Sequence, residues 1–198
     1  MKTIDYFLAP SSPYTYLGHG RLVDMARRHG AHVAVKPFDL GGTIFPASGG
    51  LPLSQRPPQR QAYRLVELKR WSLILNAPMN LKPKFFPVAG DDAARLIIAA
   101  DAGHGADAAL RVAGILLKAV WADERNIADR ATLVAIAGEA GLDGEDLFTR
   151  FEAAQATYQA YTREALQQQV FGAPWYVYQG EPFWGQDRLD FLERALAQ

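Results

Sequence analysis

Hydrophobic and polar residues change their period along this chain, and the changes outline its secondary structure. Residues 3–9 form a short apolar run, which is typical of a buried strand. Residues 13–29 carry apolar side chains at helical spacing, and Gly30 ends that pattern. Another short apolar run follows at 31–39. We therefore predict a strand–helix–strand unit whose two strands pair in parallel through a right-handed crossover.

The middle of the chain has a different pattern. A Gly- and Pro-rich stretch at 41–58 favours a functional loop or a domain junction over a strand. From there to about residue 170 the spacing of apolar residues is mostly helical, with a second loop at 76–87. The last helix of this block is predicted over about 144–169.

The C-terminal residues return to strand-like patterning. An aromatic strand is predicted at 175–178, followed by a turn, a short second strand and a helix that starts near Asp187. This order of elements predicts an α/β fold, a thioredoxin-like mixed sheet of three to four strands with a large inserted α-helical domain. Residues 1–40 and 170–198 then form a discontinuous thioredoxin-like domain, and residues 41–169 form the inserted helical domain.

Charge and hydropathy narrow the class of protein. The 198 residues include 21 Lys or Arg and 21 Asp or Glu, so the net charge is zero. An overall field that attracts nucleic acid or an anionic membrane is therefore not expected. No window approaches about 18 apolar residues without a charge, and no charged-then-apolar leader is evident. We expect a cytoplasmic protein with no membrane span.

The chain has no cysteine. This excludes disulfides, thiolate zinc sites and a cysteine nucleophile. No pair of His or acidic residues has metal-ligand spacing with supporting partners, so we expect no metal. If the protein performs thiol chemistry, the thiol must come from another molecule.

The turn between the first strand and the first helix is the main candidate site. Ser12 is predicted to be the N-cap of this helix and Pro13 its first residue, with Ser11 the less suitable serine. A helix N-terminus offers free N–H groups and a partial positive charge, which stabilise an anion or a thiolate. A nucleophilic serine needs a base, and His19 is seven positions away. The residues alone leave open a capping serine or a serine that holds a thiolate.

Several stretches, in this order along the chain, carry a resemblance to a known family. They are SPYTYLG (12–18), LKRW with NLKPKFFP (68–71 and 80–87), VFGAPWYV (170–177) and FWGQDRLDFLE (183–193). Together they resemble the 2-hydroxychromene-2-carboxylate isomerases, a branch of the kappa-class glutathione transferases related to the DsbA disulfide oxidoreductases. The resemblance extends along essentially the whole chain.

The resemblance implies glutathione as cofactor and assigns roles to particular residues. The Ser12 hydroxyl is implied to donate a hydrogen bond to the sulfur of glutathione, as the catalytic contact. Pro174 is implied to follow a cis peptide bond, so that the backbone of Ala173 holds the cysteinyl part as a short β-bridge. Gln186 and Asp187 are implied to hold the γ-glutamyl end, and Asp187 is also predicted from the residues to be the N-cap of the last helix.

The resemblance also gives roles to the two loops. The loop at 41–58 is expected to cover glutathione, although Gly49–Gly50 stands where relatives often have Gly-Asn. Arg56, Lys82 and Lys84 are candidates for the substrate carboxylate, or they are solvated loop charges. Relatives are commonly dimeric, so a homodimer is expected.

The implied activity is the glutathione-dependent isomerisation of 2-hydroxychromene-2-carboxylate to trans-o-hydroxybenzylidenepyruvate, a step in aromatic hydrocarbon catabolism. A kappa-like transferase that joins glutathione to another electrophile would use the same thiolate site. A redox-inactive DsbA-like module that binds peptides without turnover is a further alternative. The sequence leaves these alternatives open because the loops that shape the pocket determine the substrate.

Overall fold

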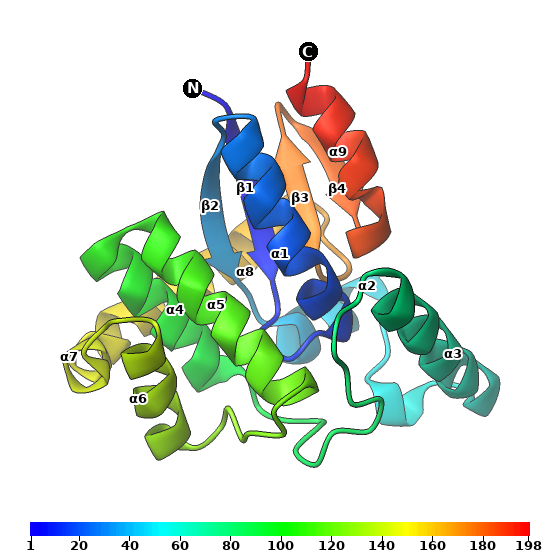
Figure 1. Cartoon of the computed structure of the whole chain (residues 1–198), viewed down its shortest axis with the longest axis horizontal. Helices are drawn as coiled ribbons and strands as arrows, with labels where there is room; N and C mark the ends of the chain where they lie inside the picture. Colours follow the sequence, from blue (N-terminus) through cyan, green and yellow to red (C-terminus); the bar gives the residue numbers. More distant parts are fainter.

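One mixed four-stranded sheet organises the molecule (Figure 1). The computed structural model describes all 198 residues. The strands are β1 (Thr3–Leu8), β2 (His32–Pro37), β3 (Trp175–Tyr178) and β4 (Glu181–Trp184), in the order β2-β1-β3-β4. β1 pairs with β2 in parallel, β3 is antiparallel to β1, and β4 is antiparallel to β3. The predicted α/β class and mixed sheet are confirmed.

Nine α-helices surround this sheet. They are α1 (Pro13–Arg28), α2 (Phe45–Ser48), α3 (Pro58–Ile74), α4 (Asp91–His104), α5 (Ala106–Trp121), α6 (Arg130–Glu139), α7 (Gly144–Thr149), α8 (Phe151–Gln167) and α9 (Leu189–Leu196). α1 and α9 lie in front of the sheet and α8 lies behind it, whereas α3 stands apart at the right of the view (Figure 1). None of the helices is both long enough and apolar enough to cross a membrane.

The alternation of side chains along β1 divides the interior into two parts. Ile4, Tyr6 and Leu8 point into the main core, which continues into α4, α5 and α6. Phe7 points to the other face, where it packs with Phe38, Ile44, Ala165, Val170 and Trp175. The strands and the middle helices thus share one main core, and β1 is buried on both faces.

Two segments of the middle block differ from the prediction. The single helix predicted over 144–169 is wrong, because Arg150 ends α7 and begins α8. The break lets the short α7 pack closely on α6: a Cβ added at Gly144 would lie 2.8 Å from the Cα of Val134. The stretch at 41–58 contains no strand, as predicted, but it holds a π-helical turn, α2 and a 3₁₀ turn at Leu53–Gln55.

Candidate functional site

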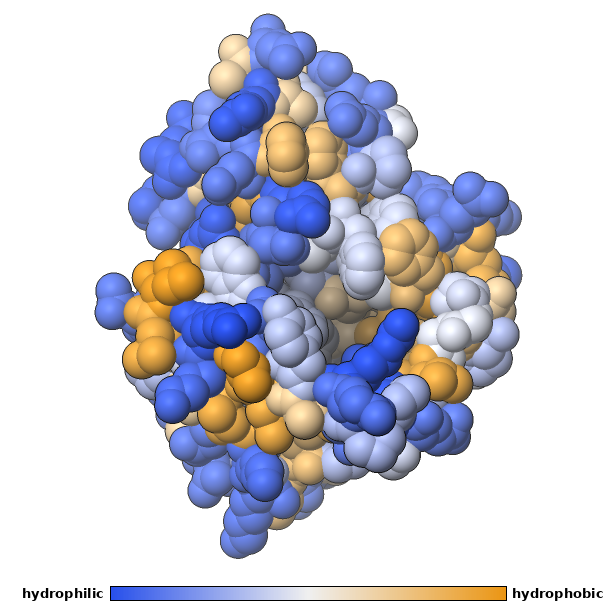
Figure 2. All heavy atoms as spheres, turned by 90° about the vertical axis from the view of Figure 1, so that its right-hand side faces the viewer, coloured by the Kyte–Doolittle hydropathy of each residue, from blue (hydrophilic) through white to orange (hydrophobic).

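A cavity of about 690 Å³ opens at the N-terminus of α1. Its walls come from the turn after β1, the segment between β2 and α3, the first turns of α3, the loop before α4 and the chain before β3. Figure 2 shows that the face carrying α3 is hollowed near its centre, with hydrophilic residues at the rim and less polar residues inside. The carboxyl end of β1 therefore leads directly into the site, as in other α/β proteins.

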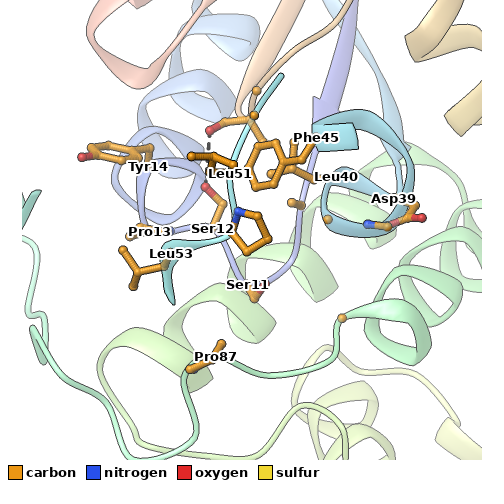
Figure 3. A pocket seen from close by; sticks show the side chains of 18 of the residues that line it. Ser11, Ser12, Pro13, Tyr14, Asp39, Leu40, Phe45, Leu51, Leu53 and Pro87 are labelled. Atoms are coloured by element: carbon orange, nitrogen blue, oxygen red, sulfur yellow. Dashed lines mark hydrogen bonds between the residues drawn. The ribbon is translucent and has the colours of Figure 1, made fainter. Parts of the chain in front are cut away.

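Ser12 occupies the centre of one wall. Its side chain accepts a hydrogen bond from the Thr15 amide at 3.2 Å, and Pro13 is the first residue of α1, so the predicted N-cap is confirmed. Its hydroxyl also donates to the backbone oxygen of Ala173 at 3.4 Å, the contact drawn as a dashed line in Figure 3. The Tyr14 amide has no backbone acceptor. The site thus combines a weakly held hydroxyl donor with a free N–H at a helix N-terminus.

Ser11 also lines the cavity but has different contacts. Its backbone oxygen accepts a hydrogen bond from Nε1 of Trp121 at 3.2 Å, which ties the turn to the buried end of α5. Its hydroxyl has no hydrogen-bond partner in the chain, whereas that of Ser12 bonds to Ala173. Ser12 is therefore the serine whose hydroxyl faces the Ala173 backbone.

The backbone before β3 faces Ser12 across the cavity. The Ala173–Pro174 peptide bond is cis, as predicted, and Pro174 is buried beneath the surface. The Ala173 amide donates no backbone hydrogen bond, and its carbonyl accepts only the long contact from Ser12. Because Ala173 lines the cavity, both of its backbone groups are available to a peptide-like ligand.

The segment 41–58 closes another side of the cavity. Phe45, Leu51 and Leu53 project from it toward the space beside Ser12 (Figure 3). A Cβ added at Gly50 would lie 2.3 Å from Cδ1 of Phe45, so an asparagine cannot replace this glycine unless the ring moves. The packing of the Phe45 ring thus requires glycine at position 50 in this chain. Residues of this loop line the cavity, and its role in covering glutathione stays a prediction.

Several residues predicted for the site do not line this cavity. Lys82 and Lys84 are exposed and do not line the cavity, because their loop turns them to solvent; the Lys84 ammonium lies 5.1 Å from the Phe85 ring centre. The Gln186 side chain is buried outside the cavity and accepts a hydrogen bond from Arg21 at 3.0 Å. Of the three predicted cations, only Arg56 lines the cavity.

Asp187 is also not the N-cap of the last helix, which corrects the prediction. It lies in a 3₁₀ turn, Gln186–Arg188, and α9 begins only at Leu189 with no side-chain cap. The tight turn at Gly185, whose φ is 102°, places the Asp187 carboxylate against Arg188 at 2.8 Å instead. Asp187 is exposed and outside the cavity lining.

Sequence reasoning missed Arg64, which lines the cavity from α3. Its residue is only 8% exposed, and its guanidinium carbon lies 5.3 Å from the ring centre of Phe86 and 5.6 Å from that of Trp121. Burial lowers the pKa of this guanidinium, with the positive charge of Arg56 adding to the effect. A signal was present: Arg60 and Arg64 are four residues apart, the spacing that places side chains on one face of a helix, and both line the cavity.

The sequence of the whole chain matches one known family. The profile of the DSBA-like thioredoxin domain matches residues 3–197. The chain belongs to the DsbA-like thioredoxin family. The chain has no cysteine at the turn after β1 or anywhere else.

Relatives of known name show which members of this family the chain resembles. A 2-hydroxychromene-2-carboxylate isomerase from Sphingobium xenophagum is 30% identical over 197 residues, with 98% of each chain covered. A protein of the same name from Pseudomonas putida is 28% identical, covering 98% of this chain and 94% of that one. These findings confirm the resemblance seen in the sequence motifs.

Solved structures agree with this placement. A 2-hydroxychromene-2-carboxylate isomerase structure has a TM-score of 0.80 and 25% identity, with 98% of this chain and 94% of that chain covered. The cytosolic disulfide reductase DsbM from Pseudomonas aeruginosa shares the fold, with a TM-score of 0.70 at 18% identity and 98% of both chains covered. No group of three or more His, Cys, Asp or Glu side chains is placed to hold a metal ion.

Proposed function

We propose that this protein is a glutathione-dependent isomerase that converts 2-hydroxychromene-2-carboxylate to trans-o-hydroxybenzylidenepyruvate during aromatic hydrocarbon catabolism. The isomerase names of its relatives support the reaction type. The observation that carries the proposal is that the Ser12 hydroxyl, at the N-terminus of α1, faces the Ala173 backbone in a chain without cysteine. The Ala173 amide has no backbone acceptor, and its carbonyl accepts only the 3.4 Å contact from Ser12.

The residues present fit glutathione. A cysteinyl residue needs a backbone donor and a backbone acceptor beside a group that stabilises its sulfur. Ala173 offers an unpaired N–H and a carbonyl held only by a 3.4 Å contact, and Ser12 and the free Tyr14 amide lie at the positive end of α1. A cavity of about 690 Å³ has room for a ligand of this size.

The chemistry of bound glutathione would be a thiolate that adds to the conjugated, ring-opened substrate and is eliminated after bond rotation. The chain's own residues act by binding and positioning. With glutathione bound, the Ser12 hydroxyl would exchange its long contact with Ala173 for a hydrogen bond to the sulfur, which would lower the pKa of the thiol. The Ala173 backbone fixes the cysteinyl unit, and Phe45, Leu51 and Leu53 exclude water from this side of the cavity.

The test is an ultraviolet assay with the chromene carboxylate on desalted protein. Activity is expected to be absent without thiol, to return with glutathione, and to be inhibited by S-methylglutathione, which keeps the peptide contacts but has no ionisable sulfur. With trace glutathione the reaction is expected to reach equilibrium over many turnovers, because an isomerase consumes no thiol.

Two outcomes contradict this proposal in different ways. Stoichiometric loss of thiol would identify a kappa-like transferase acting on an electrophile. No heat of binding in a calorimetric titration with glutathione would exclude both enzymes and favour a redox-inactive binding module.

A further inference from the structure

Arg64 is a charged group inside the wall of the cavity. It lies in the second turn of α3, where the residue is buried and its guanidinium lies over two aromatic rings, Phe86 and Trp121. The two rings are themselves packed at 4.7 Å between centres. Aromatic faces attract a cation, but they provide no conventional hydrogen-bond acceptor for the N–H groups of a guanidinium.

No group of the chain neutralises this charge. Arg64 forms no ion pair and no side-chain hydrogen bond, and the charged or titratable groups near it are Tyr14 and Arg56. The Tyr14 phenol is neutral at ordinary pH because burial raises its pKa, so it does not neutralise the guanidinium. An arginine does not escape this cost by losing its proton. A buried charge without a partner is unfavourable, and such groups in proteins are usually paired. The open side of Arg64 faces the cavity.

Trp121 connects Arg64 to the Ser12 turn. One face of the indole carries the guanidinium, and its Nε1 donates to the Ser11 backbone oxygen at 3.2 Å. Trp121 is fully buried, so close packing restricts the movement of its indole ring and fixes both contacts. Trp121 therefore contacts both the Arg64 guanidinium and the turn that carries Ser12, and Arg64 and Ser12 line the same cavity.

We propose that Arg64 binds the carboxylate of a planar aromatic ligand in this cavity. The planar fork of the guanidinium suits a bidentate contact with a carboxylate, and Phe86 supplies an apolar ring on the cavity surface for the aromatic part. The other predicted candidates are less suited: Lys82 and Lys84 are outside the cavity, and Arg56 donates its Nε to the Leu51 oxygen at 2.8 Å within its own loop. The identification of this ligand as the isomerase substrate rests on the proposed function; the carboxylate site itself does not.

Glutathione also has carboxylates, so the experiment separates the two sources. The probes are 2-naphthoate and its neutral analogue 2-naphthamide, titrated by calorimetry into the protein with and without glutathione. The wild-type protein is expected to prefer the acid over the amide. Arg64→Met is expected to lose roughly tenfold or more in naphthoate affinity, the loss typical of a hydrogen-bonded charge pair, with little change for naphthamide.

Two further variants serve as controls. Arg64→Lys keeps the charge without the planar fork and is expected to recover part of the preference for the acid. Lys69→Met removes a charge on the same helix, at an exposed position outside the cavity lining, and is expected to change naphthoate affinity by less than about threefold. Naphthamide binding reports whether Arg64→Met keeps a folded cavity.

The outcomes are distinct. Equal naphthoate affinity in the wild type and in Arg64→Met overturns the inference, as does loss of glutathione affinity in Arg64→Met with naphthoate affinity kept, which would give Arg64 to a glutathione carboxylate. If the wild type fails to bind glutathione but prefers naphthoate through Arg64, the proposed function fails and the carboxylate site stands.

Discussion

The polar cluster beside β2 and the wall of the cavity each hold a cation over an aromatic ring, but in opposite surroundings. Lys36 of β2 lies 5.3 Å from the Phe7 ring centre and is paired with Asp5 at 2.9 Å and Glu164 at 2.6 Å. Arg64 lies over its rings with no carboxylate partner. The charge of Lys36 is balanced by carboxylates of the chain, whereas the charge of Arg64 is not.

His19 shows a third way to keep a basic group inside the protein. It is buried in α1, where Nε2 lies 3.0 Å from the Leu110 oxygen and Nδ1 lies 3.2 Å from the Tyr6 hydroxyl. Because a carbonyl only accepts, Nε2 carries the proton and Nδ1 accepts from Tyr6. Burial lowers the pKa of this imidazole to about 4, so it is neutral at ordinary pH. Pairing and neutralisation stabilise the fold, whereas an uncompensated arginine indicates a binding site.

The largest expected effect is on the cluster beside β2. Lys36→Met leaves two partly buried carboxylates without their cation and is expected to lower the free energy of unfolding by about 3 kcal/mol, the lower end for breaking a buried ion pair. The matched change in the cavity, Arg64→Met, is expected to leave that free energy unchanged or higher, because it removes a charge that has no partner. Urea unfolding of both variants measures the difference. An equal loss in the two variants would break the comparison.

The second effect is a loss of stability in acid. The unfolded chain protonates its histidine near pH 6.5, whereas folded His19 stays neutral down to about pH 4. The contribution of neutral His19 is therefore fully present above pH 6.5 and is lost as the pH falls from 6.5 to about 4, by about 3 kcal/mol in total. Unfolding free energies measured across this range are expected to fall less steeply in His19→Gln. His104→Gln, at an exposed position, is expected to keep the wild-type slope.

The third effect concerns the Ser12 hydroxyl, whose hydrogen bond to the Ala173 oxygen is long at 3.4 Å. Ser12→Ala is expected to raise the thiol pKa of bound glutathione and to lower kcat/KM by an amount worth about 1.5–3 kcal/mol, since a hydrogen bond to a charged acceptor is lost. Loss of the N-cap also costs about 0.5–2 kcal/mol of stability. Ser11→Ala is the control, measured by ultraviolet titration of the thiolate and by steady-state rates. Loss of activity in Ser11→Ala alone would show that the other serine holds the sulfur.

The smallest effect is expected at the turn before α9. Asp187→Ala removes an exposed carboxylate that pairs with its neighbour Arg188, so the free energy of unfolding is expected to change by less than about 1 kcal/mol. Glutathione affinity, measured by calorimetry, is expected to stay close to that of the wild type because Asp187 lies outside the cavity lining. A large loss of affinity would mean that bound glutathione extends beyond this cavity to the turn.

Local chemistry explains the parts of the site that the sequence predicts. Ser12 and Pro13 determine a helix N-terminus by hydrogen bonding and by a fixed φ, and both act within a few residues of each other. The missing cysteine excludes a resident thiol wherever the chain folds. Asp187 shows the limit of such reasoning, because its capping role depended on where α9 begins, and Gly185 delays that start.

The sequence by itself determined the order of strands and helices, the capped turn at Ser12 and the family, because periodicity and capping depend on neighbours along the chain. Only the tertiary structure decided which cations meet the cavity. Lys82, Lys84 and Arg64 are equally basic in the sequence, but the position of α3 against Phe86 and Trp121 buries only Arg64 in the cavity wall. The partners of a charge come from distant segments, so whether it is paired is a property of the packed fold.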